Sequence, residues 1–394
     1  MISQIQVNNF RNYNLCRINC NKQIVVLYGK NGSGKTNILE AISLFACGKG
    51  LRNAQYDSII NKNASDNFWS VQICFGPHRM TSVYTKENNR GRRTFKIDDL
   101  TVKNPDIFAK DYYILWMTYE TDRLFLHAPS NRRAFIDMLC YSIFQNHEKH
   151  IADYEQLSRE RKKILAQYSY ENLNSSDIKN NKWLDIVEKK LVDSGVEIIK
   201  NRMQIAEILD SEQISYEGFP SFTNNMSGPI EDFIKNNKTE DCLDKKIKDF
   251  YSDNLKQSRE KDFFTKSTSI GPNKSDWHVH HCGKNISASL CSAGEQKITL
   301  IAIFLSFMMY KLNNDTRTMI ILLDDVITHL DKSHQESLFE IIKNITRTNT
   351  KIQVWLSGVN KTIFDSFCDD KLGTSFIDIE NTHAECSIIH NNQP

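Results

Sequence analysis

The sequence predicts an α/β fold in which a mainly parallel sheet carries a long helical insertion. Two observations predict it. Short apolar segments alternate with segments of helical spacing at both ends of the chain, and a charge-rich helical stretch separates these ends. The 394 residues correspond to two or three domains at roughly 100–200 residues each. We expect one head domain built from residues 1–117 and 266–394, with a helical arm at 118–265 inserted between its two parts.

The N-terminal part of the predicted head begins with a strand, a loop and a helix. Ile24–Tyr28 is a short continuous apolar segment, which is typical of a parallel strand buried on both faces. Asn37–Phe45 has apolar residues at helical spacing. Residues 68–75 and 79–85 are predicted strands, and the basic residues 92–97 are predicted to complete a hairpin.

The inserted segment has a different character. Apolar residues recur at mixed three- and four-residue spacing over 130–165 and 181–210, and this pattern predicts amphipathic helices. Residues 172–181 and 219–238 are rich in Asn, Ser, Gly and Pro and are predicted loops. Even about 60 residues of unbroken helix would reach only about 90 Å, so the insertion is a short arm.

Strands and helices alternate again after residue 266. Ile298–Tyr310 predicts a strongly apolar helix. Met319–Leu323 and Lys351–Leu356 predict buried strands. Because apolar strands that alternate with helices form parallel sheets, these segments complete the head.

The composition excludes several classes of protein. The 50 basic and 48 acidic residues give a formal charge of +2, so any surface for nucleic acid must be a local patch. The most apolar stretch, Leu300–Tyr310, is too short to cross a bilayer. The first residues, MISQIQVNNF, do not have the pattern of a secretory signal, and ten cysteines without a CxxC pair predict reduced thiols. We therefore expect a cytoplasmic protein without a membrane partner.

A phosphate-binding motif lies between the first strand and the first helix. The segment GKNGSGKT fits GxxxxGK[ST], and its residues are Gly29, Lys30, Asn31, Gly32, Ser33, Gly34, Lys35 and Thr36. We call it the phosphate loop. Its backbone N–H groups would surround the phosphates, Lys35 would reach the β- and γ-phosphates, and the Thr36 hydroxyl would bind Mg²⁺. The alternative is a glycine-rich turn that contains Lys-Thr by chance.

An acidic pair follows the strand at 319–323. At the carboxyl edge of a parallel sheet, Asp324 would face the metal ion beside the phosphates. Asp325 would lie further out, where it could orient or deprotonate an attacking water. Since Asp325 is one methylene shorter than Glu, its role as a base is the weaker part of this interpretation. The alternative is a buried strand that ends in acidic turn residues.

The segment Ser292-Ala293-Gly294-Glu295-Gln296 begins the apolar helix, and we call it the signature segment. One interpretation is a capping box, in which Ser292 caps the helix and Glu295 returns a hydrogen bond. The other is a helix N-terminus that points N–H groups at a phosphate, with Gly294 permitting a close approach. On that interpretation Ser292, Gly294 and Gln296 contact the nucleotide.

The order of these three motifs resembles that of ABC-type ATPase heads. Nearly the whole chain is similar to the RecF family of bacterial DNA replication and repair proteins. The segments that carry this resemblance are Asn9–Tyr13, Gly50–Arg52, Thr118–Phe125, Arg132–Asp137, Tyr154–Leu157 with Arg161–Leu165, and Asp324–Val326 through His329–Asp331. The implied fold is an ABC-type P-loop ATPase head with an inserted helical arm.

The resemblance implies ATP and Mg²⁺ as cofactors and a slow ATPase that acts as a switch. In such heads the signature segment completes the nucleotide site of a second subunit, so the implied assembly is an ATP-dependent homodimer. It would clamp double-stranded or gapped DNA without sequence preference and help to load recombinase, with RecR and RecO type mediators as partners. The resemblance also implies that Arg11 and Asn12 lie near the base or ribose and that Asp331 lies at the subunit contact.

The chain departs from the family pattern at three places. Gly271–Asp276 replaces a usual Gly-Pro-His-Arg-Asp-Asp segment, and Tyr119 replaces a usual proline. Ser357-Gly358 stands where transport-type ATPases have a switch histidine. This last departure predicts slow hydrolysis, which suits a switch better than a motor.

Other clusters have weaker signals. On a strand, His278, His280 and Cys282 would share one face, but a zinc site would need a fourth ligand. Two basic runs could contact DNA phosphates, although a solvated face is the more common role of such runs. The first run is Arg90, Arg92, Arg93 and Lys96, and the second is Arg159, Arg161, Lys162 and Lys163.

Two rival functions remain open at this point. The chain could be the ATPase subunit of a nuclease or defence complex built on the same head, although no metal-carboxylate nuclease domain is visible after Asp331. It could also be a nucleotide-dependent scaffold without catalysis, if Asp325 is too short to activate water.

Overall fold

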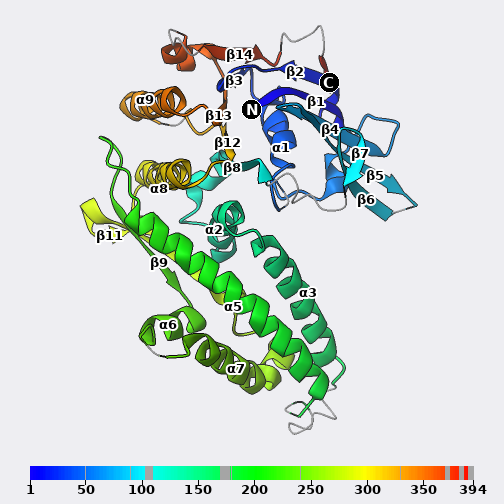
Figure 1. Cartoon of the computed structure of the whole chain (residues 1–394), viewed down its shortest axis with the longest axis vertical. Helices are drawn as coiled ribbons and strands as arrows, with labels where there is room; N and C mark the ends of the chain where they lie inside the picture. The colour runs from blue at the N-terminus through cyan, green and yellow to red at the C-terminus, as the bar shows by residue number, and fades with distance from the viewer. Residues whose placement is uncertain are drawn as a thin grey trace. The chain divides into compact units, whose positions relative to one another are not determined.

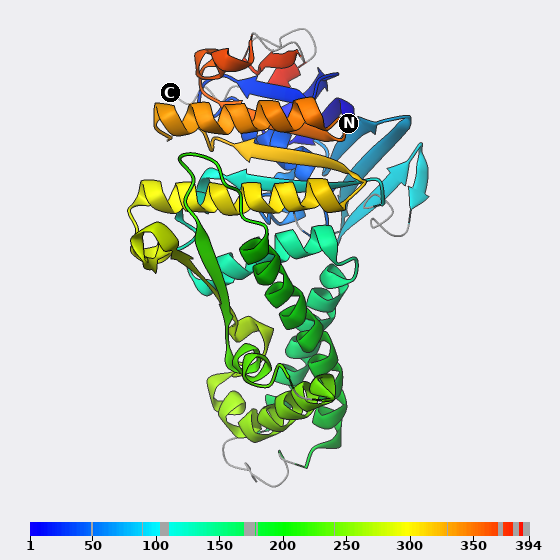
Figure 2. The ribbon, with the colours of Figure 1, turned by 60° about the vertical axis from the view of Figure 1, so that its left-hand side comes forward.

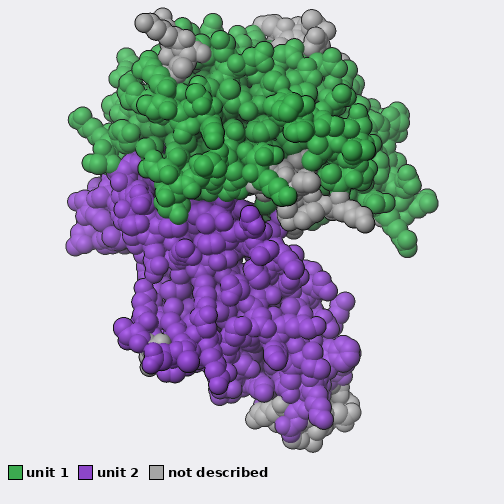
Figure 3. Space-filling model, viewed as in Figure 1, with its two compact units in different colours: residues 1–122, 215–219, 308–394 green, residues 123–214, 220–307 purple. Residues whose placement is uncertain are grey.

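The structure, a computed structural model, describes residues 1–48, 50–88, 90–102, 110–168, 178, 180–239, 241–328, 330–368, 373–380 and 386–388. The chain divides into two compact units (Figure 3). Unit 1 comprises residues 1–122, 215–219 and 308–394, and unit 2 comprises residues 123–214 and 220–307. Residues 266–307, which the sequence analysis assigned to the head, thus lie in unit 2. The domain boundaries at 117/118 and 265/266 stay a prediction.

Unit 1 contains a five-stranded parallel sheet in the order β14-β3-β13-β12-β8. Its strands are β3 (Ile24–Tyr28), β8 (Tyr112–Thr118), β12 (Thr318–Asp324), β13 (Ile352–Gly358) and β14 (Thr374–Asp378). All four pairings are parallel, which confirms the parallel sheet expected from the apolar strands. Helices α1 (Lys35–Ser43) and α9 (Lys332–Thr348) lie on opposite faces of this sheet (Figure 1). The central strands are therefore buried on both faces, as β12 and β13 are over nearly their whole length.

Unit 1 also contains a seven-stranded antiparallel sheet in the order β15-β2-β1-β4-β5-β6-β7. Its strands are β1 (Ile2–Phe10), β2 (Tyr13–Asn19), β4 (Phe68–Phe75), β5 (His78–Glu87), β6 (Arg90–Ile97), β7 (Leu100–Val102) and β15 (Cys386–Ile388). Strands β4, β5 and the basic β6 were predicted from the sequence, whereas β1 and β2 were not. The register of β1 against β4 shifts between Ile2 and Gln4, and this shift breaks the apolar–polar alternation that would reveal the strand.

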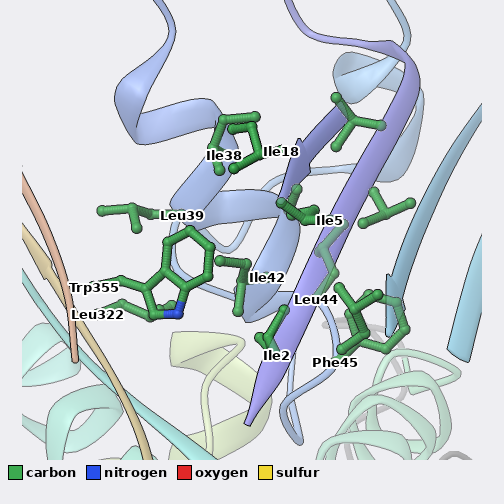
Figure 4. Packing of buried hydrophobic residues seen from close by; sticks show 14 of the residues in the cluster. Ile2, Ile5, Ile18, Ile38, Leu39, Ile42, Leu44, Phe45, Leu322 and Trp355 are labelled. Atoms are coloured by element: carbon green, nitrogen blue, oxygen red, sulfur yellow. The ribbon is translucent and has the colours of Figure 1, made fainter. Parts of the chain in front are cut away.

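Helix α1 joins the two sheets of unit 1 into one core. Figure 4 shows Leu39 and Ile42 of this helix beside Trp355 of β13, with Ile2 and Ile5 of β1 on the other side. All five side chains are at most 1% exposed. Since α1 follows the phosphate loop directly, this packing fixes the position of the loop at the edge of the parallel sheet.

Unit 2 is a helical arm with a small sheet. Its helices are α2 (Pro129–Ile143), α3 (His147–Leu165), α5 (Lys182–Ser211), α6 (Pro229–Asn236) and α7 (Leu243–Thr265). Its three-stranded sheet has the order β11-β10-β9, with β9 (Phe222–Ser227), β10 (Asp276–His281) and β11 (Ile286–Ser287). Helix α8 (Ala293–Asn314) begins in unit 2 and ends in unit 1. Short 3-10 helices occur at 56–59, 119–123, 272–274, 282–284, 288–290 and 361–367.

The helical prediction for the arm is confirmed over both long runs, but the predicted loop at 219–238 is wrong. That segment forms β9 and α6, and β9 runs beside α5 (Figure 2). Phe222 and Met226 of β9 and Ile230 of α6 are buried. Their few apolar residues are spaced among Asn, Ser and Thr, so tertiary packing outweighs the local preference for a loop. The other predicted loop, 172–181, lies mostly outside the described residues.

A buried ion-pair network holds the three long helices of the arm together. The Arg161 guanidinium on α3 donates to Glu188 of α5 at 2.8 Å and to Asp262 of α7 at 2.7 Å. Arg259 of α7 donates to the same Glu188 and, at 2.7 Å, to Asp185. Arg161 is 1% exposed, so it is unavailable to DNA, contrary to its place in the basic run proposed from the sequence.

Two expectations from composition have different outcomes. Among the residues that the structure describes, none of the helices combines the length and the hydropathy that a membrane span requires. Within the part of the chain that the structure describes, eight cysteines are free thiols, but Cys16 is disulfide-bonded, so the expectation of reduced thiols fails at this position.

Candidate functional site

The phosphate loop turns tightly between β3 and α1. Gly29, Gly32 and Gly34 have φ angles of 146°, 83° and 112°, in the region that favours glycine. A Cβ at Gly34 would collide with the Tyr13 hydroxyl. The loop therefore requires glycine at this position for two reasons, its backbone conformation and the contact with Tyr13.

Lys35 begins α1 and is held inside the loop. Its ammonium group donates to the carbonyls of Gly29 at 2.6 Å and Lys30 at 2.8 Å. Burial lowers the pKa of Lys35, and the nearby carboxylates of Asp325, Asp324 and Glu380 oppose this effect. The Lys35 ammonium group thus bonds to the opposite end of the loop and places a positive charge where a polyanion would bind.

Thr36 and Asp324 meet although they are 288 residues apart in the sequence. The Thr36 hydroxyl donates to Asp324 Oδ1 at 2.9 Å, and the Ser357 hydroxyl donates to the same oxygen at 2.8 Å. Asp324 is 6% exposed; burial raises its pKa, and the bonds from Ser357 and Thr36 partly offset this rise. β3, β12 and β13 are adjacent and parallel, so their carboxyl ends bring these three residues to one edge of the sheet.

Asp325 stands one residue beyond the strand and has a φ of 55°. Its carboxylate accepts a hydrogen bond from the Thr328 hydroxyl, and its N–H donates to Ser357 Oγ at 2.8 Å. Ser357 thus links the two acidic residues, Asp324 and Asp325, through its hydroxyl group. From the sequence, Ser357 was expected only as a substitute for a switch histidine, and Thr328 was not among the candidate residues.

The N-terminal family segment supports the phosphate loop from the side of β1 and β2. Arg11 has a φ of 57°, and its guanidinium forms a two-bond ion pair with Glu40 of α1 and donates to Ser58 O at 2.8 Å. Asn12 accepts a 2.6 Å hydrogen bond from Asn37 and donates to Ser33 O at 3.4 Å. In this structure the two side chains brace the loop and its helix, and their proposed contact with base or ribose stays a prediction.

The signature segment forms the capping box foreseen for it. Ser292 N–H donates to Glu295 at 3.0 Å, and Glu295 N–H donates to Ser292 Oγ at 3.5 Å. The Lys284 ammonium pairs with Glu295 at 2.5 Å, and this bond, with those from Ser292, lowers the pKa of Glu295 to about 2. Ser292 and Gly294 are exposed, and a Cβ at Gly294 would have no neighbour within 4 Å. This helix N-terminus can therefore be approached by a ligand.

Gln296 faces the other way. It is 2% exposed, and its amide nitrogen donates to Cys291 O at 2.8 Å. Its amide oxygen is buried without a hydrogen-bond partner. Gln296 thus holds the turn before α8 through this bond, and its contact with nucleotide stays a prediction.

In the segment that follows the acidic pair, from Val326 to Asp331, His329 lies outside the described residues. Asp331 caps α9 by accepting from His334 N–H at 2.9 Å. Hydrogen bonds from the backbone of His334 and then from Ser333 lower the pKa of Asp331 to about 2. The Asp331 carboxylate is exposed, as a residue at a subunit contact would be in a single chain.

The residues at the sheet edge fit a magnesium nucleotide. Ser33 Oγ is buried in the loop without a hydrogen-bond partner, and a phosphate oxygen could supply one. Thr36 and Asp324 offer a hydroxyl and a carboxylate oxygen, the ligand types that Mg²⁺ prefers. Lys35 adds a positive charge beside them.

The histidine cluster on β10 does not converge. His278 bonds to Ser227 at 3.0 Å and His280 to Asn285 at 3.0 Å, and His281 accepts from Lys284 N–H at 3.3 Å. Each of these side chains thus has its own partner. Only one face of β10 is open to solvent, since Trp277 and Val279 on the other face are buried.

One cluster of metal-ligand type occurs among the described residues, formed by Asp137, Cys140 and His147. Arg202 donates twice to Asp137, at 2.7 and 2.8 Å, and His147 Nε2 lies 3.0 Å from the same carboxylate. Burial raises the pKa of Cys140 well above its ordinary value, so its thiol stays protonated. The guanidinium already neutralises the carboxylate, so this is a structural ion pair rather than a metal site.

The altered segment Gly271–Asp276 is bonded within unit 2. Arg132 of α2 forms a two-bond ion pair with Asp276 at 2.7 and 2.8 Å, and Arg133 donates to Ser275 O at 2.8 Å. The family-like residues at the start of the arm therefore anchor this segment to α2.

Exposed cations remain on both units. Arg90 and Arg92 of β6 are exposed, whereas the Arg93 guanidinium lies 4.3 Å from the centre of the Phe95 ring. On the arm Lys162 and Lys163 are exposed. Each basic run thus contains both exposed cations and an arginine that packs against the protein, Arg93 in the first run and Arg161 in the second.

Comparisons with known proteins agree with this geometry. Residues 1–110 match the family described as RecF/RecN/SMC N terminal domain. The chain is 32% identical to the DNA replication and repair protein RecF of Rickettsia akari (strain Hartford) over 369 residues, 93% of this chain and 96% of the relative. The RecF of Rickettsia conorii (strain ATCC VR-613 / Malish 7) is also 32% identical, over 370 residues and the same shares.

Solved structures agree on the fold. A structure of the recombination mediator protein RecF-ATP in the RecFOR pathway matches with a TM-score of 0.78 and 19% identity, covering 99% of this chain and 97% of that one. A second, RecF-ATPrS of the same pathway, matches with a TM-score of 0.73 and 19% identity over 92% and 93% of the two chains. The α/β ATPase-head fold with its arm is thereby confirmed.

Proposed function

The chain belongs to the RecF family of DNA replication and repair proteins, and from that premise we propose that it is an ATP-dependent DNA-binding protein of recombinational repair and replication restart. ATP would dimerise it around double-stranded or gapped DNA, and hydrolysis would release the DNA. The observation that carries the proposal is the 2.9 Å hydrogen bond between Thr36 and Asp324, which joins the phosphate loop to the acidic strand.

The residues at the sheet edge have distinct roles in this proposal. The phosphate loop holds the β- and γ-phosphates through its N–H groups and Lys35. Thr36 and Asp324 hold Mg²⁺, which neutralises charge on the phosphates when bound. Asp325, oriented by Thr328, accepts a proton from the attacking water. Because Asp325 is short and Ser357 replaces a switch histidine, we expect slow turnover.

The signature segment is proposed to act on a second copy of the chain. Ser292 and Gly294 are exposed at a helix N-terminus, which favours an anion. If they close over the γ-phosphate of another subunit, ATP is a ligand shared between two copies and shifts the monomer–dimer equilibrium. Two-fold symmetry then gives two nucleotides per dimer.

DNA binding is assigned to exposed cationic side chains that contact phosphates and do not distinguish the base sequence. Arg90 and Arg92 on β6, and Lys162 and Lys163 on the arm, can neutralise phosphates. Phosphate contacts of this kind position a protein but carry no base information. RecR and RecO type mediators are the proposed partners, supported by the RecFOR context of the solved relatives.

The alternative, an ATPase subunit of a nuclease or defence complex, has less support. The relatives named above are RecF proteins, and their similarity covers 93% of this chain. Across the described ranges, the one cluster of metal-ligand type is the buried set at Asp137, whose carboxylate Arg202 neutralises.

The proposal is tested by sedimentation with Mg-ATP, with and without gapped DNA. We expect the wild type to dimerise on ATP and to hold DNA as a dimer. Lys35→Met should lose ATP binding, and Ser292→Arg should bind ATP yet stay monomeric. Ser267→Arg, an exposed serine just beyond α7, is the matched control and should dimerise.

Each outcome bears on a different part of the proposal. A wild type that binds ATP and remains monomeric on DNA would refute the clamp. A Ser292→Arg variant that dimerises normally would remove the signature segment from the subunit contact. A nuclease that co-purifies with the chain would support the alternative function.

A further inference from the structure

Glu380 reaches the phosphate loop from the edge strand of the parallel sheet. β14 pairs in parallel with β3, and Asp378 is the register partner of Tyr28. Ile379 N–H continues the pairing by donating to Tyr28 O at 3.0 Å. Glu380 and Lys30 each stand two residues beyond the register pair, so the sheet itself sets one beside the other.

The contact with the loop is specific. Glu380 Oε1 accepts from the backbone N–H of Lys30 at 2.7 Å. The Lys30 ammonium lies 3.8 Å from Oε2 and is 86% exposed, so this ion pair contributes little. A Cβ at Gly29 would lie 3.4 Å from Glu380 Cγ, which shows how closely the Glu380 side chain packs on the loop. The hydrogen bond to the Lys30 N–H group is therefore the main contact between Glu380 and the loop.

The loop needs an anchor because of its composition. Three of its residues are glycines with positive φ, and glycine loses more conformational freedom on ordering than any other residue. The loop is held at its far end by α1 and from one side by Asn12 and Tyr13, which contact Ser33 O. Glu380 holds the other end, at the first residue after Gly29.

We propose that Glu380 is a positioning residue that anchors the start of the phosphate loop in the nucleotide-free chain and so prepares it for the phosphates. This inference rests on the proposed nucleotide binding for its effect on affinity. The anchor itself is a property of the chain alone. A loop already held in its binding conformation loses less entropy when the nucleotide binds.

Two substitutions separate the acceptor from the charge. Glu380→Gln keeps an oxygen that accepts from Lys30 N–H, whereas Glu380→Ala removes it. Glu340→Ala is the matched control, since this glutamate of α9 has a 59% exposed side chain and only a 3.9 Å pair with Lys343. The measurements are hydrogen exchange of the Lys30 amide in the nucleotide-free chain and equilibrium binding of Mg-ATP.

We expect Glu380→Ala to speed the exchange of the Lys30 amide and to weaken Mg-ATP binding roughly three- to tenfold, the net worth of one hydrogen bond. Glu380→Gln and Glu340→Ala should stay within about twofold of the wild type in both measurements.

Three results would overturn the inference: unchanged exchange in Glu380→Ala, equal effects of Glu380→Gln and Glu380→Ala, or faster exchange with unaltered affinity. Because the exchange measurement needs no nucleotide, it decides the anchor even if the wild type fails to bind Mg-ATP. That failure would instead refute the proposed function.

Discussion

Arg161 offers the sharpest test of how the arm is held together. The residue lies in a basic run that the sequence suggests for DNA, but the structure buries it between three helices. We consider Arg161→Ala, which removes the guanidinium and its bonds to Glu188, Asp262 and the Leu255 carbonyl.

The expected cost follows from what each partner keeps. Glu188 retains its ion pair with Arg259. Asp262, which is 2% exposed, retains only hydrogen bonds from Ser258 Oγ and Ser269 N–H, each 2.9 Å, and loses its ion-pair partner. One buried carboxylate is therefore left uncompensated. Breaking a buried pair in this way costs about 3–5 kcal/mol in the free energy of unfolding.

The assay is urea unfolding at neutral pH, followed by circular dichroism. Arg159→Ala is the matched control, because Arg159 is on the same helix and its pair with Glu155, at 3.7 Å, is 67% and 55% exposed. Its cost should be at most about 1 kcal/mol. Adding Asp262→Asn to Arg161→Ala should restore at least ~0.5 kcal/mol, since it removes the uncompensated charge.

Two results would refute this reasoning. If Arg161→Ala costs no more than Arg159→Ala, the buried network does not stabilise the arm. If Asp262→Asn lowers stability as much in the Arg161→Ala background as in the wild type, the two residues are not coupled. DNA binding gives a further comparison, because Arg159→Ala can reduce its salt dependence while Arg161 is shielded from phosphate.

Three further predictions concern the loop, the metal site and pH. Gly34→Ala should abolish Mg-ATP binding in an equilibrium assay, because a Cβ would strike the Tyr13 hydroxyl and the residue has a φ of 112°. Asp324→Asn should weaken nucleotide binding in Mg²⁺ more than tenfold but much less in EDTA, as titrations in the two buffers would show. The arm should lose stability as the pH falls below about 6.5, because burial lowers the pKa of His147 and the unfolded chain takes up the proton first. A second loss of stability should follow below about pH 4. Burial alone would raise the pKa of Asp137, but Arg202 and His147 outweigh this effect and lower it to about 2, so the unfolded chain takes up the proton first. Urea midpoints measured from pH 8 to 3 would check both steps, and a flat profile in this range would contradict them.

The sequence by itself determined the features that consecutive residues encode. The phosphate loop is eight adjacent residues between an apolar strand and a helix, and β3 has the bounds expected for that strand. The capping box at Ser292 depends on a spacing of three residues and was likewise foreseen. Such features are local, because backbone geometry over a few residues dictates which side chains meet.

Helical periodicity would have separated the arginines of the arm. Arg159 and Arg161 are two residues apart, which places them on roughly opposite sides of a helix with 3.6 residues per turn. One side packs on α5 and α7, and the other faces solvent. The sequence contained this difference, but the run of positive charge obscured it.

The place of Asp324 beside the phosphates was expected from the sequence, but only the tertiary structure decided which other distant residues meet at the phosphate loop. Glu380 contacts Lys30 because β14 is the neighbour of β3, and Ser357 bonds to Asp324 because β13 lies beside β12. The order of strands in a parallel sheet depends on crossovers between segments hundreds of residues apart. No local pattern encodes that order, and it is set by the burial of both faces of the sheet against its helices.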